Sequence, residues 1–276
     1  MNDRELLWLA QLFYAASVVL TMRRVQVGSV SAQLHRWNLL TMILGFVLHT
    51  VFLYQRGMQI GRCPLTNPFE VQVFLAWGMV LFYLLIGPSY RVSFLGAFTA
   101  PVVLTLCVVP LLAPIDVARQ APATRSPWIE FHAAIAVLSC GAFALAAVIS
   151  AMYRWQERQL KARRSTSLFL QLPPVEQLDV VALRLIIVGF ALFSVGIVGG
   201  FISYRIIHRL TPLRAGLTIA KIVWAWAVWG AYALVLVART AASIRGRKFA
   251  VTAIALFIFT LVTFCVINLL PKSPQP

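Results

Sequence analysis

Three histidines lie where an imidazole ring could bind a metal ion or an iron-containing cofactor. His49 is embedded in the apolar stretch GFVLHTVFLYQRG, His132 stands at the start of a long apolar stretch, and His208 lies in the basic segment SYRIIHRLTPLRAG. The neutral imidazole is a common ligand of zinc, copper and haem iron. The alternative for each ring is a hydrogen bond that only packs two helices together, so the surrounding residues must decide.

Haem fits these surroundings better than a bare metal ion. Zinc and copper sites usually add cysteine, carboxylate or a third close ligand, but the sequence contains no H-x-x-x-H pair, and its four cysteines show no C-x-x-C or C-x-x-C-H spacing. Haem needs only one or two axial imidazoles on an apolar, aromatic wall, with cations for its propionates. Aromatic residues that could form the wall are Trp128, Phe131, Phe201, Tyr204, Trp224 and Trp226. Arginines placed to pair with propionates are Arg205, Arg209 and Arg214. The other role open to the tryptophans is the aromatic belt at a membrane surface.

These residues must be positioned by membrane-spanning helices. Hydrophobic residues make up 61% of the 276 residues and charged residues 12%, and the mean hydropathy is +0.84. Such a chain has too few polar side chains to cover a soluble globule, so we expect an all-α, polytopic membrane protein in contact with the lipid bilayer. The net charge of +16 lies in short basic runs between apolar stretches, which argues for membrane insertion and against a nucleic-acid partner.

Eight apolar stretches are long enough to cross a bilayer, which takes about 20 residues. They lie near residues 5–22, 37–55, 69–87, 93–112, 131–153, 180–202, 218–238 and 249–270. We expect them to form one integral membrane domain over residues 1–276.

The distribution of Lys and Arg predicts the orientation of these spans. The loops after the first, third, fifth and seventh spans hold more Lys and Arg than the others, and the densest run is RWQERQLKARR at 154–164. Basic loops stay in the cytoplasm, so both termini are expected on the outer side. His132 is then at the outer mouth of the fifth span and His208 in the outer loop after the sixth. His49 is about 9 Å below the outer end of the second span, at 1.5 Å per residue. Three histidines from separate helices thus converge on the outer half of the bilayer.

The segment after the second span, GRCPLTNPFEVQVFLAW at residues 61–77, carries a specific motif. Asn67 and Glu70 can cap a helix that starts here, because the amide oxygen accepts from free N–H groups and the acid complements the helix dipole. The segment also closely resembles the P-x-(S/T)-N-x-(Y/F)-E-x-x-x-F-L-x-W motif of cytochrome c assembly proteins of the CcsA/ResC type, which have HemX-type relatives.

Further segments resemble the same family in the same order. WIEFHAAIAVLSCGAFALAAVISAMY at 128–153 is similar to the family's span that opens with a haem-ligand histidine, here His132. LDVVALRLIIVGFALFSVGIVGG at 178–200 is similar to a segment with a matching arginine, here Arg184. Its glycines, at small-residue spacing, predict a close approach of two helices.

KIVWAWAVWGAYAL at 221–234 completes the resemblance, which covers roughly residues 40–270. Lys221 begins this span on the outer side and could pair with Glu70 or with a haem propionate, whereas snorkelling to the membrane surface is the simpler role for Lys221 and Arg184. The residues that match the family motifs are Asn67, Glu70, Arg184, Lys221 and Trp224.

Two parts of the family pattern are missing from this sequence. The tryptophan-rich W-G-x-x-W-x-W-D-P-K signature should lie between Gly200 and Lys221, where only Lys221 and the following Trp224 remain. The family's second outer histidine, expected after the last span, has no counterpart here. His208 could replace that ligand. The competing geometry is a haem ligated within the membrane by His49, which resembles an intramembrane histidine of many bacterial relatives.

The resemblance implies a function in cytochrome c biogenesis in a bacterial-type plasma (inner) membrane. The protein would bind b-type, non-covalent haem through His132 with His208 or His49, and present it at the outer face for attachment to apocytochrome c. The family shares this work with a membrane partner of the ResB/CcsB type. No Ser-His-Asp arrangement with a supporting motif and no glycine-rich phosphate loop is found in the sequence, so we do not expect an enzyme.

Two other functions stay open. Loss of the tryptophan-rich signature favours a HemX-like protein that regulates haem biosynthesis or haem supply. A small-molecule transporter would need inverted repeats and broken helices. Pro101, Pro110 and Pro114 interrupt the fourth span and its exit, but the last three spans show no matching pattern.

Overall fold

The computed structural model describes residues 3–27, 32–86, 95–113, 116, 127–163, 173–210, 215–241 and 244–269. Most of these residues lie in helices. In chain order the helices are α1 (Asp3–Val27), α2 (Ala32–Ile60), α3 (Pro68–Ile86), α4 (Leu95–Leu112), α5 (Pro127–Lys161), α7 (Val175–Leu210), α8 (Ala215–Thr240) and α9 (Arg247–Leu269). The expectation of an all-α fold is confirmed for this part of the chain.

Each predicted span falls on one of these helices, and all eight helices are long and apolar enough to cross a membrane. The chain is therefore a multi-pass membrane protein. α4 continues through Pro101 and Pro110, so these prolines do not divide it into the half-helices that line many transporter sites.

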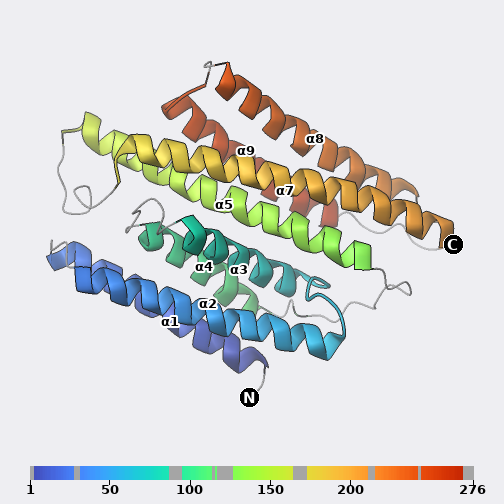
Figure 1. The fold of residues 1–276 in the computed structure, drawn as a ribbon, viewed down its shortest axis with the longest axis horizontal. Helices are drawn as coiled ribbons and strands as arrows, with labels where there is room; N and C mark the ends of the chain where they lie inside the picture. Colours follow the sequence, from blue (N-terminus) through green and yellow to red (C-terminus); the bar gives the residue numbers. More distant parts are fainter. Residues whose placement is uncertain are drawn as a thin grey trace.

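α5 and α7 lie side by side through the middle of the bundle (Figure 1). Helices α1 to α4 pack on one side of this pair, and α8 and α9 pack on the other. The first group joins the pair where α3 crosses α5 at two glycines. A Cβ added to Gly141 would lie 3.1 Å from the carbonyl carbon of Gly78, so the two backbones approach more closely than larger residues would allow.

A row of glycines lets α7 approach α5, as the spacing of these residues predicts. The row is Gly189, Gly196, Gly199 and Gly200. A Cβ added to Gly189 would lie 2.7 Å from the ring of Phe143, and one added to Gly200 would lie 2.8 Å from the ring of His132. Phe143 and His132 of α5 thus fill the space that side chains at positions 189 and 200 of α7 would occupy.

Most of the basic run after the fifth span is helical and not a loop as predicted. α5 continues through Lys161, because RWQERQLK contains good helix formers. Glu157 also pairs with Arg154 and with Lys161, at the i,i+3 and i,i+4 spacings that stabilise helices.

The predicted outer loop around His208 is also largely helical. α7 continues to Leu210, so the backbone of His208 belongs to its last turn. No glycine or proline lies between Gly200 and Pro212 to end the helix earlier. α8 begins at Ala215, so Lys221 lies in its second turn and does not open the helix.

Replacement of Gly189 by alanine is expected to destabilise the bundle by about 1–3 kcal/mol, the usual cost of overpacking. The new Cβ would meet the Phe143 ring, which cannot move aside because it stacks on Tyr232 with ring centroids 3.8 Å apart. The matched control is Gly230→Ala, where a Cβ meets nothing within 4 Å. Thermal unfolding in detergent compares the variants, and equal midpoints would contradict the tight contact.

Candidate functional site

The candidate site is built around His132, near the start of α5. It lies at the end of the bundle where α2 ends, α3 and α5 begin, and α7 ends, on the right of Figure 1. We call this the His132 end. The half-buried imidazole lies against the glycine row of α7, where a Cβ on Gly200 would be 2.8 Å from Cε1 and 3.0 Å from Nδ1. The ring therefore fits only because residue 200 has no side chain.

The backbone of α7 determines which nitrogen of His132 carries the proton. Nδ1 lies 2.6 Å from the carbonyl oxygen of Gly196. That oxygen can only accept, so the neutral ring donates from Nδ1 and keeps its lone pair on Nε2. Histidines that bind metals usually donate their second N–H to a carbonyl or carboxylate, which orients the ring and raises its basicity. The hydrogen bond of His132 is therefore one that would suit a metal-binding imidazole.

Two exposed aromatic rings lie beside His132 on α5, and an arginine packs against a third ring on α7, beyond Gly200. Trp128 and Phe131 precede it on α5, pack edge to face with centroids 6.2 Å apart, and are 46% and 43% exposed. On α7 the guanidinium of Arg205 lies 5.5 Å from the ring centroid of Phe201. Apolar rings with a cation nearby suit a flat, apolar ligand that carries carboxylates.

His49 contacts different helices from His132. Its ring is fully buried, with Nδ1 3.4 Å from the hydroxyl oxygen of Tyr14 and with Phe52 beside it. Its Nε2 is buried without a hydrogen-bond partner of normal geometry. α2 ends at Ile60, so His49 lies about 16 Å from that end at 1.5 Å per residue, deeper than the predicted 9 Å.

A cluster of ion pairs holds α1 to α4 together at the His132 end. Arg56 of α2 donates to Glu70 of α3 at 3.0 Å and to Asp116, after α4, at 2.6 Å. Asp116 also accepts from Arg4 of α1 at 2.8 Å and from the side-chain amide of Asn67 at 2.9 Å. The side chains of Glu70 and Asp116 are only 1% and 8% exposed. We call these five residues the Arg56 cluster.

The predicted cap of α3 is confirmed. The side-chain oxygen of Asn67 accepts from the backbone N–H of Glu70 at 2.8 Å, and Pro68 takes the first helical position, which prolines favour. Glu70 Oε2 accepts from both the backbone N–H and the hydroxyl of Thr66, each at 2.7 Å. Asn67 and Glu70 thus serve twice, once in the cap and once in the Arg56 cluster.

The family-motif residues of α8 are Lys221 and Trp224. Trp224 donates its indole N–H to Thr263 of α9 at 2.8 Å, so this ring faces α9. Lys221 is exposed on α8. Glu70, which the sequence offers as its partner, has its carboxylate oxygens engaged by Arg56 and Thr66.

The remaining predicted residues divide between the two ends of the bundle. Arg184 is exposed on α7, and Asp179 near it pairs with Arg239 of α8, at the end opposite His132. His208 and Arg209 belong to the last turn of α7, but their side chains lie outside the described part of the chain.

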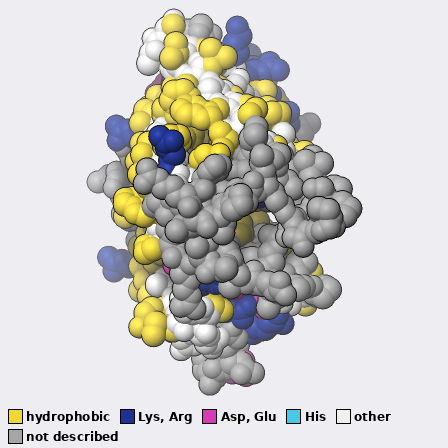
Figure 2. All heavy atoms as spheres, turned by 90° about the vertical axis from the view of Figure 1, so that its right-hand side faces the viewer, with side chains coloured by type: hydrophobic (Ala, Val, Ile, Leu, Met, Phe, Trp, Pro, Cys, Tyr) yellow, Lys and Arg dark blue, Asp and Glu magenta, His cyan; other side chains and the backbone are white. Residues whose placement is uncertain are grey.

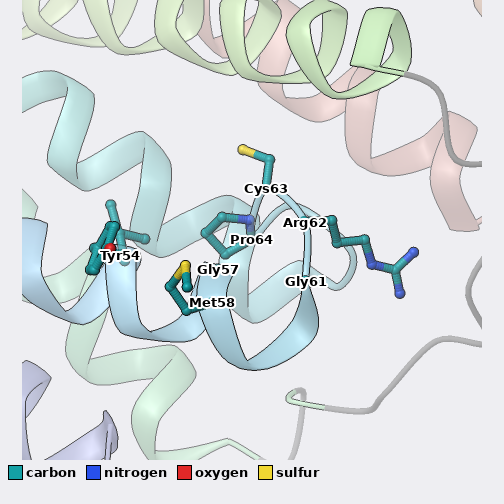
Figure 3. A pocket seen from close by; sticks show the side chains of 8 residues that line it. Tyr54, Gly57, Met58, Gly61, Arg62, Cys63 and Pro64 are labelled. Atoms are coloured by element: carbon teal, nitrogen blue, oxygen red, sulfur yellow. The ribbon is translucent and has the colours of Figure 1, made fainter.

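An open groove of about 510 Å³ lies between the end of α2 and the segment before α3 (Figure 3). Its lining is Leu53, Tyr54, Gly57, Met58, Gly61, Arg62, Cys63 and Pro64. Cys63 points toward α5, and its backbone N–H donates to Glu130 at 3.1 Å. Burial, together with the charges of Glu130 and Glu70, raises the pKa of the Cys63 thiol to about 11. At neutral pH it is therefore a thiol and not a reactive thiolate.

In the end-on view, the described hydrophobic side chains are seen beside scattered Lys and Arg side chains (Figure 2). Hydrophobic side chains gather toward the edge where Figure 1 places α8. The exposed apolar residues of α8 include Val223 and Trp226, which are 62% and 54% exposed. Apolar helix ends bordered by tryptophan and basic residues are typical of a membrane–water interface.

Sequence reasoning missed the roles of three residues of this end. Gly196 acts through its backbone carbonyl, and no pattern of residue types predicts that role. Arg56 and Asp116 pair across 60 positions, and only the fold brings them together. The glycine spacing of α7 was a usable signal for close packing, but not for the hydrogen bond to His132.

The chain matches the model of a family described as cytochrome C assembly protein over residues 65–274. It is 25% identical to the cytochrome c biogenesis protein CcsA of Prochlorococcus marinus over 260 residues, which cover 84% of this chain and 81% of that protein. A CcsA protein of Synechococcus is 27% identical over the same shares. Protein HemX of Brevibacillus brevis is 29% identical over 204 residues, covering 72% of this chain and 74% of HemX. The range matched by the family model contains His132 but not His49.

Replacement of Arg56 by glutamine is expected to destabilise the protein by about 3–5 kcal/mol, because two nearly buried carboxylates lose their shared cation. Arg4→Gln is the control. The Arg4 side chain is 49% exposed, so its pair with Asp116 contributes at most about 1 kcal/mol. Thermal unfolding of both variants in detergent measures the difference, and a similar loss for the two would refute the dominant role of Arg56.

Proposed function

Because the chain belongs to the cytochrome c assembly protein family, we propose that it binds haem at the His132 end and presents it for attachment to apocytochrome c. The observation that carries this proposal is the hydrogen bond from His132 Nδ1 to the Gly196 carbonyl. It leaves Nε2 as the donor atom for haem iron. Haem is here the cargo, held by non-covalent contacts until it is passed on.

His208 is the proposed second axial ligand. It lies two helical turns beyond Gly200 on α7, the helix against which the His132 ring already packs. His49 is the competing ligand, because its Nε2 is buried and has no hydrogen bond of normal geometry. A haem on His49 would lie within the bilayer, between helices other than those that hold His132.

The remaining parts of the proposed site recognise the porphyrin and its propionates. Trp128 and Phe131 offer exposed apolar rings on α5. Arg205 and Arg209, near the end of α7, pair with the propionates, as arginine does with carboxylates. These contacts orient the haem so that one edge faces the client protein.

The proposed setting is a bacterial plasma membrane with the His132 end and both termini on the outer side. The densest basic run, at 154–164, then lies in the cytoplasm. A ResB/CcsB-type membrane protein is the proposed partner in attachment, and apocytochrome c is the client. In this scheme the chain itself catalyses no reaction.

A HemX-like function in regulating haem biosynthesis or supply is the second candidate. The similarity to HemX of Brevibacillus brevis and the missing tryptophan-rich signature favour it. Deletion of the gene separates the two functions. Loss of cytochrome c that carries covalently bound haem, with haem precursor levels unchanged, supports assembly. Normal cytochrome c with altered precursor levels supports regulation and overturns the assembly proposal.

The visible absorption spectrum of the purified protein tests haem binding. We expect a Soret band with sharp low-spin bands after reduction, lost in His132→Ala because the iron loses an axial imidazole. His208→Ala and His49→Ala identify the second ligand, since only the variant that lacks it changes the low-spin bands. A protein that stays colourless and takes up no added haem would refute the proposal.

Gly200→Ala tests the positioning of His132 without removing the ligand. The new Cβ would displace the imidazole from the Gly196 carbonyl, and we expect haem affinity to fall about 10–100-fold, as it does when an outer-shell partner is lost. Gly230→Ala, in open space on α8, is the matched control. Haem titration measures both, and unchanged affinity in Gly200→Ala would contradict the proposed geometry.

A further inference from the structure

The groove between the end of α2 and the segment before α3 opens onto the membrane-facing surface of α2. Its volume is about 510 Å³. Tyr54 and Met58, which line it, are 68% and 67% exposed. α2 is apolar enough to be a span as far as Ile60, so these two side chains face lipid just below the membrane surface. The groove is therefore within reach of the acyl chains of the bilayer.

An apolar stripe on α2 leads along the bilayer to this groove. Its members are each at least 38% exposed and follow one another at alternating spacings of four and three residues, which places them on one face of the helix. The apolar stripe consists of Leu40, Leu44, Val47, Val51, Tyr54 and Met58. It is about 27 Å long at 1.5 Å per residue, which is close to the thickness of the hydrocarbon core. An acyl chain can thus follow it from the groove toward the middle of the bilayer.

A tight turn places Arg62 just beyond the end of α2. Gly61 has a φ of 64°, the left-handed conformation that commonly ends a helix at glycine. The backbone N–H of Arg62 then donates to the carbonyl of Gly57 at 3.1 Å. Figure 3 shows the side chain of Arg62 extending past the helix end, away from Tyr54 and Met58. The groove therefore has an apolar wall toward the bilayer and a guanidinium at the membrane surface.

Arg62 has a buried hydrogen-bond donor that no group of the described chain uses. Its Nε is buried and has no hydrogen-bond partner among the described residues. An arginine that only snorkels keeps its charged head in water, whereas buried donors in native proteins nearly always have a partner.

The carboxylates of this end are engaged by other groups. Glu70 pairs with Arg56. Glu130 accepts from the backbone N–H of Cys63. The guanidinium of Arg62 is therefore suited to an acceptor from outside the chain, and an anionic one complements its charge.

We propose that this groove binds one phospholipid of the surrounding bilayer, with its phosphate on Arg62 and an acyl chain on the apolar stripe of α2. Arginine suits this ligand because its planar fork of N–H donors matches two oxygens of a phosphate. Basic residues next to membrane spans recognise lipid headgroups by the same chemistry. Neither feature alone would select a phospholipid, but the groove joins a cation at the membrane surface to an apolar track below it.

A lipid in this groove would hold the segment that links two halves of the bundle. Cys63 follows Arg62 directly, and its backbone N–H donates to Glu130 of α5 at 3.1 Å. Glu130 lies two residues before His132. The segment that contacts the headgroup therefore also attaches α2 and α3 to the start of α5. The lipid site needs no haem, so it stands or falls separately from the proposed function.

Native mass spectrometry of the haem-free full chain, stripped of lipid in detergent and titrated with dioleoyl phosphatidylglycerol, tests the site. We expect the first lipid to bind more tightly than later ones. In Arg62→Gln its dissociation constant should rise about tenfold, because a charge-assisted contact to the phosphate is lost. The matched control is Arg158→Gln, which removes the same charge from an exposed residue of α5 at the other end of the bundle and should leave the first lipid unchanged.

Two outcomes of this titration would overturn the proposal. Equal weakening in Arg62→Gln and Arg158→Gln would show only a general attraction between a basic protein and an anionic lipid. A wild-type chain without a distinct first lipid would leave the groove to a protein partner. Dioleoylglycerol, which has the same chains and no phosphate, should bind at least tenfold more weakly than the phospholipid, and equal binding would contradict the role of Arg62.

A second pair of variants tests the apolar part of the site. Met58→Gln keeps the length of the side chain but makes the groove wall polar, so we expect the first phospholipid to bind about fivefold more weakly. Met22→Gln is the control, because Met22 is also exposed, at 56%, but lies on α1 outside the groove. Unchanged binding in Met58→Gln, or displacement of the lipid by glycerol 3-phosphate, would show a phosphate site without a chain and overturn the proposal.

Discussion

The contact between the glycine row of α7 and the facing side of α5 is the constraint on which the rest of the structure depends. Gly189 makes room for Phe143 in the core, and Gly200 makes room for His132 at the end of the same interface. Helix spacing and ligand position are therefore set by one surface. A side chain at Gly189 would collide with Phe143, and one at Gly200 would displace the imidazole.

The Arg56 cluster imposes a second constraint, from the other half of the bundle. At this end of α1 to α4, nearly buried charges need partners, because removing one leaves its neighbour unpaired. Glu70 and Asp116 share Arg56, and Asn67 links this pairing to the start of α3. The Gly78–Gly141 crossing then attaches this half to α5. The family motif near Asn67 thus supports the His132 end from outside the proposed haem site.

The sequence predicts the helices well and the site less well, for physical reasons. Apolar stretches of about 20 residues are a strong signal for spans, but they do not mark where a helix ends outside the apolar region. Hence α7 reaches Leu210 and takes up His208, which charge and loop length alone had placed in a loop. Local capping by Asn67 was predictable because both partners lie within one turn.

Long-range partners were not predictable in this way. The carbonyl of Gly196 is a backbone group available at every residue, and Arg56 meets Asp116 only because α2 and α4 end at the same side of the bundle. The apolar stripe of α2 was present in the sequence at spacings of three and four residues. Its meaning depended on which face of the helix is exposed, and composition does not give that.

The most direct test of the account is chemical rescue of His132→Gly with free imidazole, followed by the visible spectrum during haem titration. If His132 supplies an axial imidazole from a site preformed by α7, the variant should bind haem weakly alone and regain the low-spin spectrum when imidazole is added. Wild-type haem affinity and spectrum in His132→Gly without imidazole would contradict the account, because the iron would then take its ligands elsewhere.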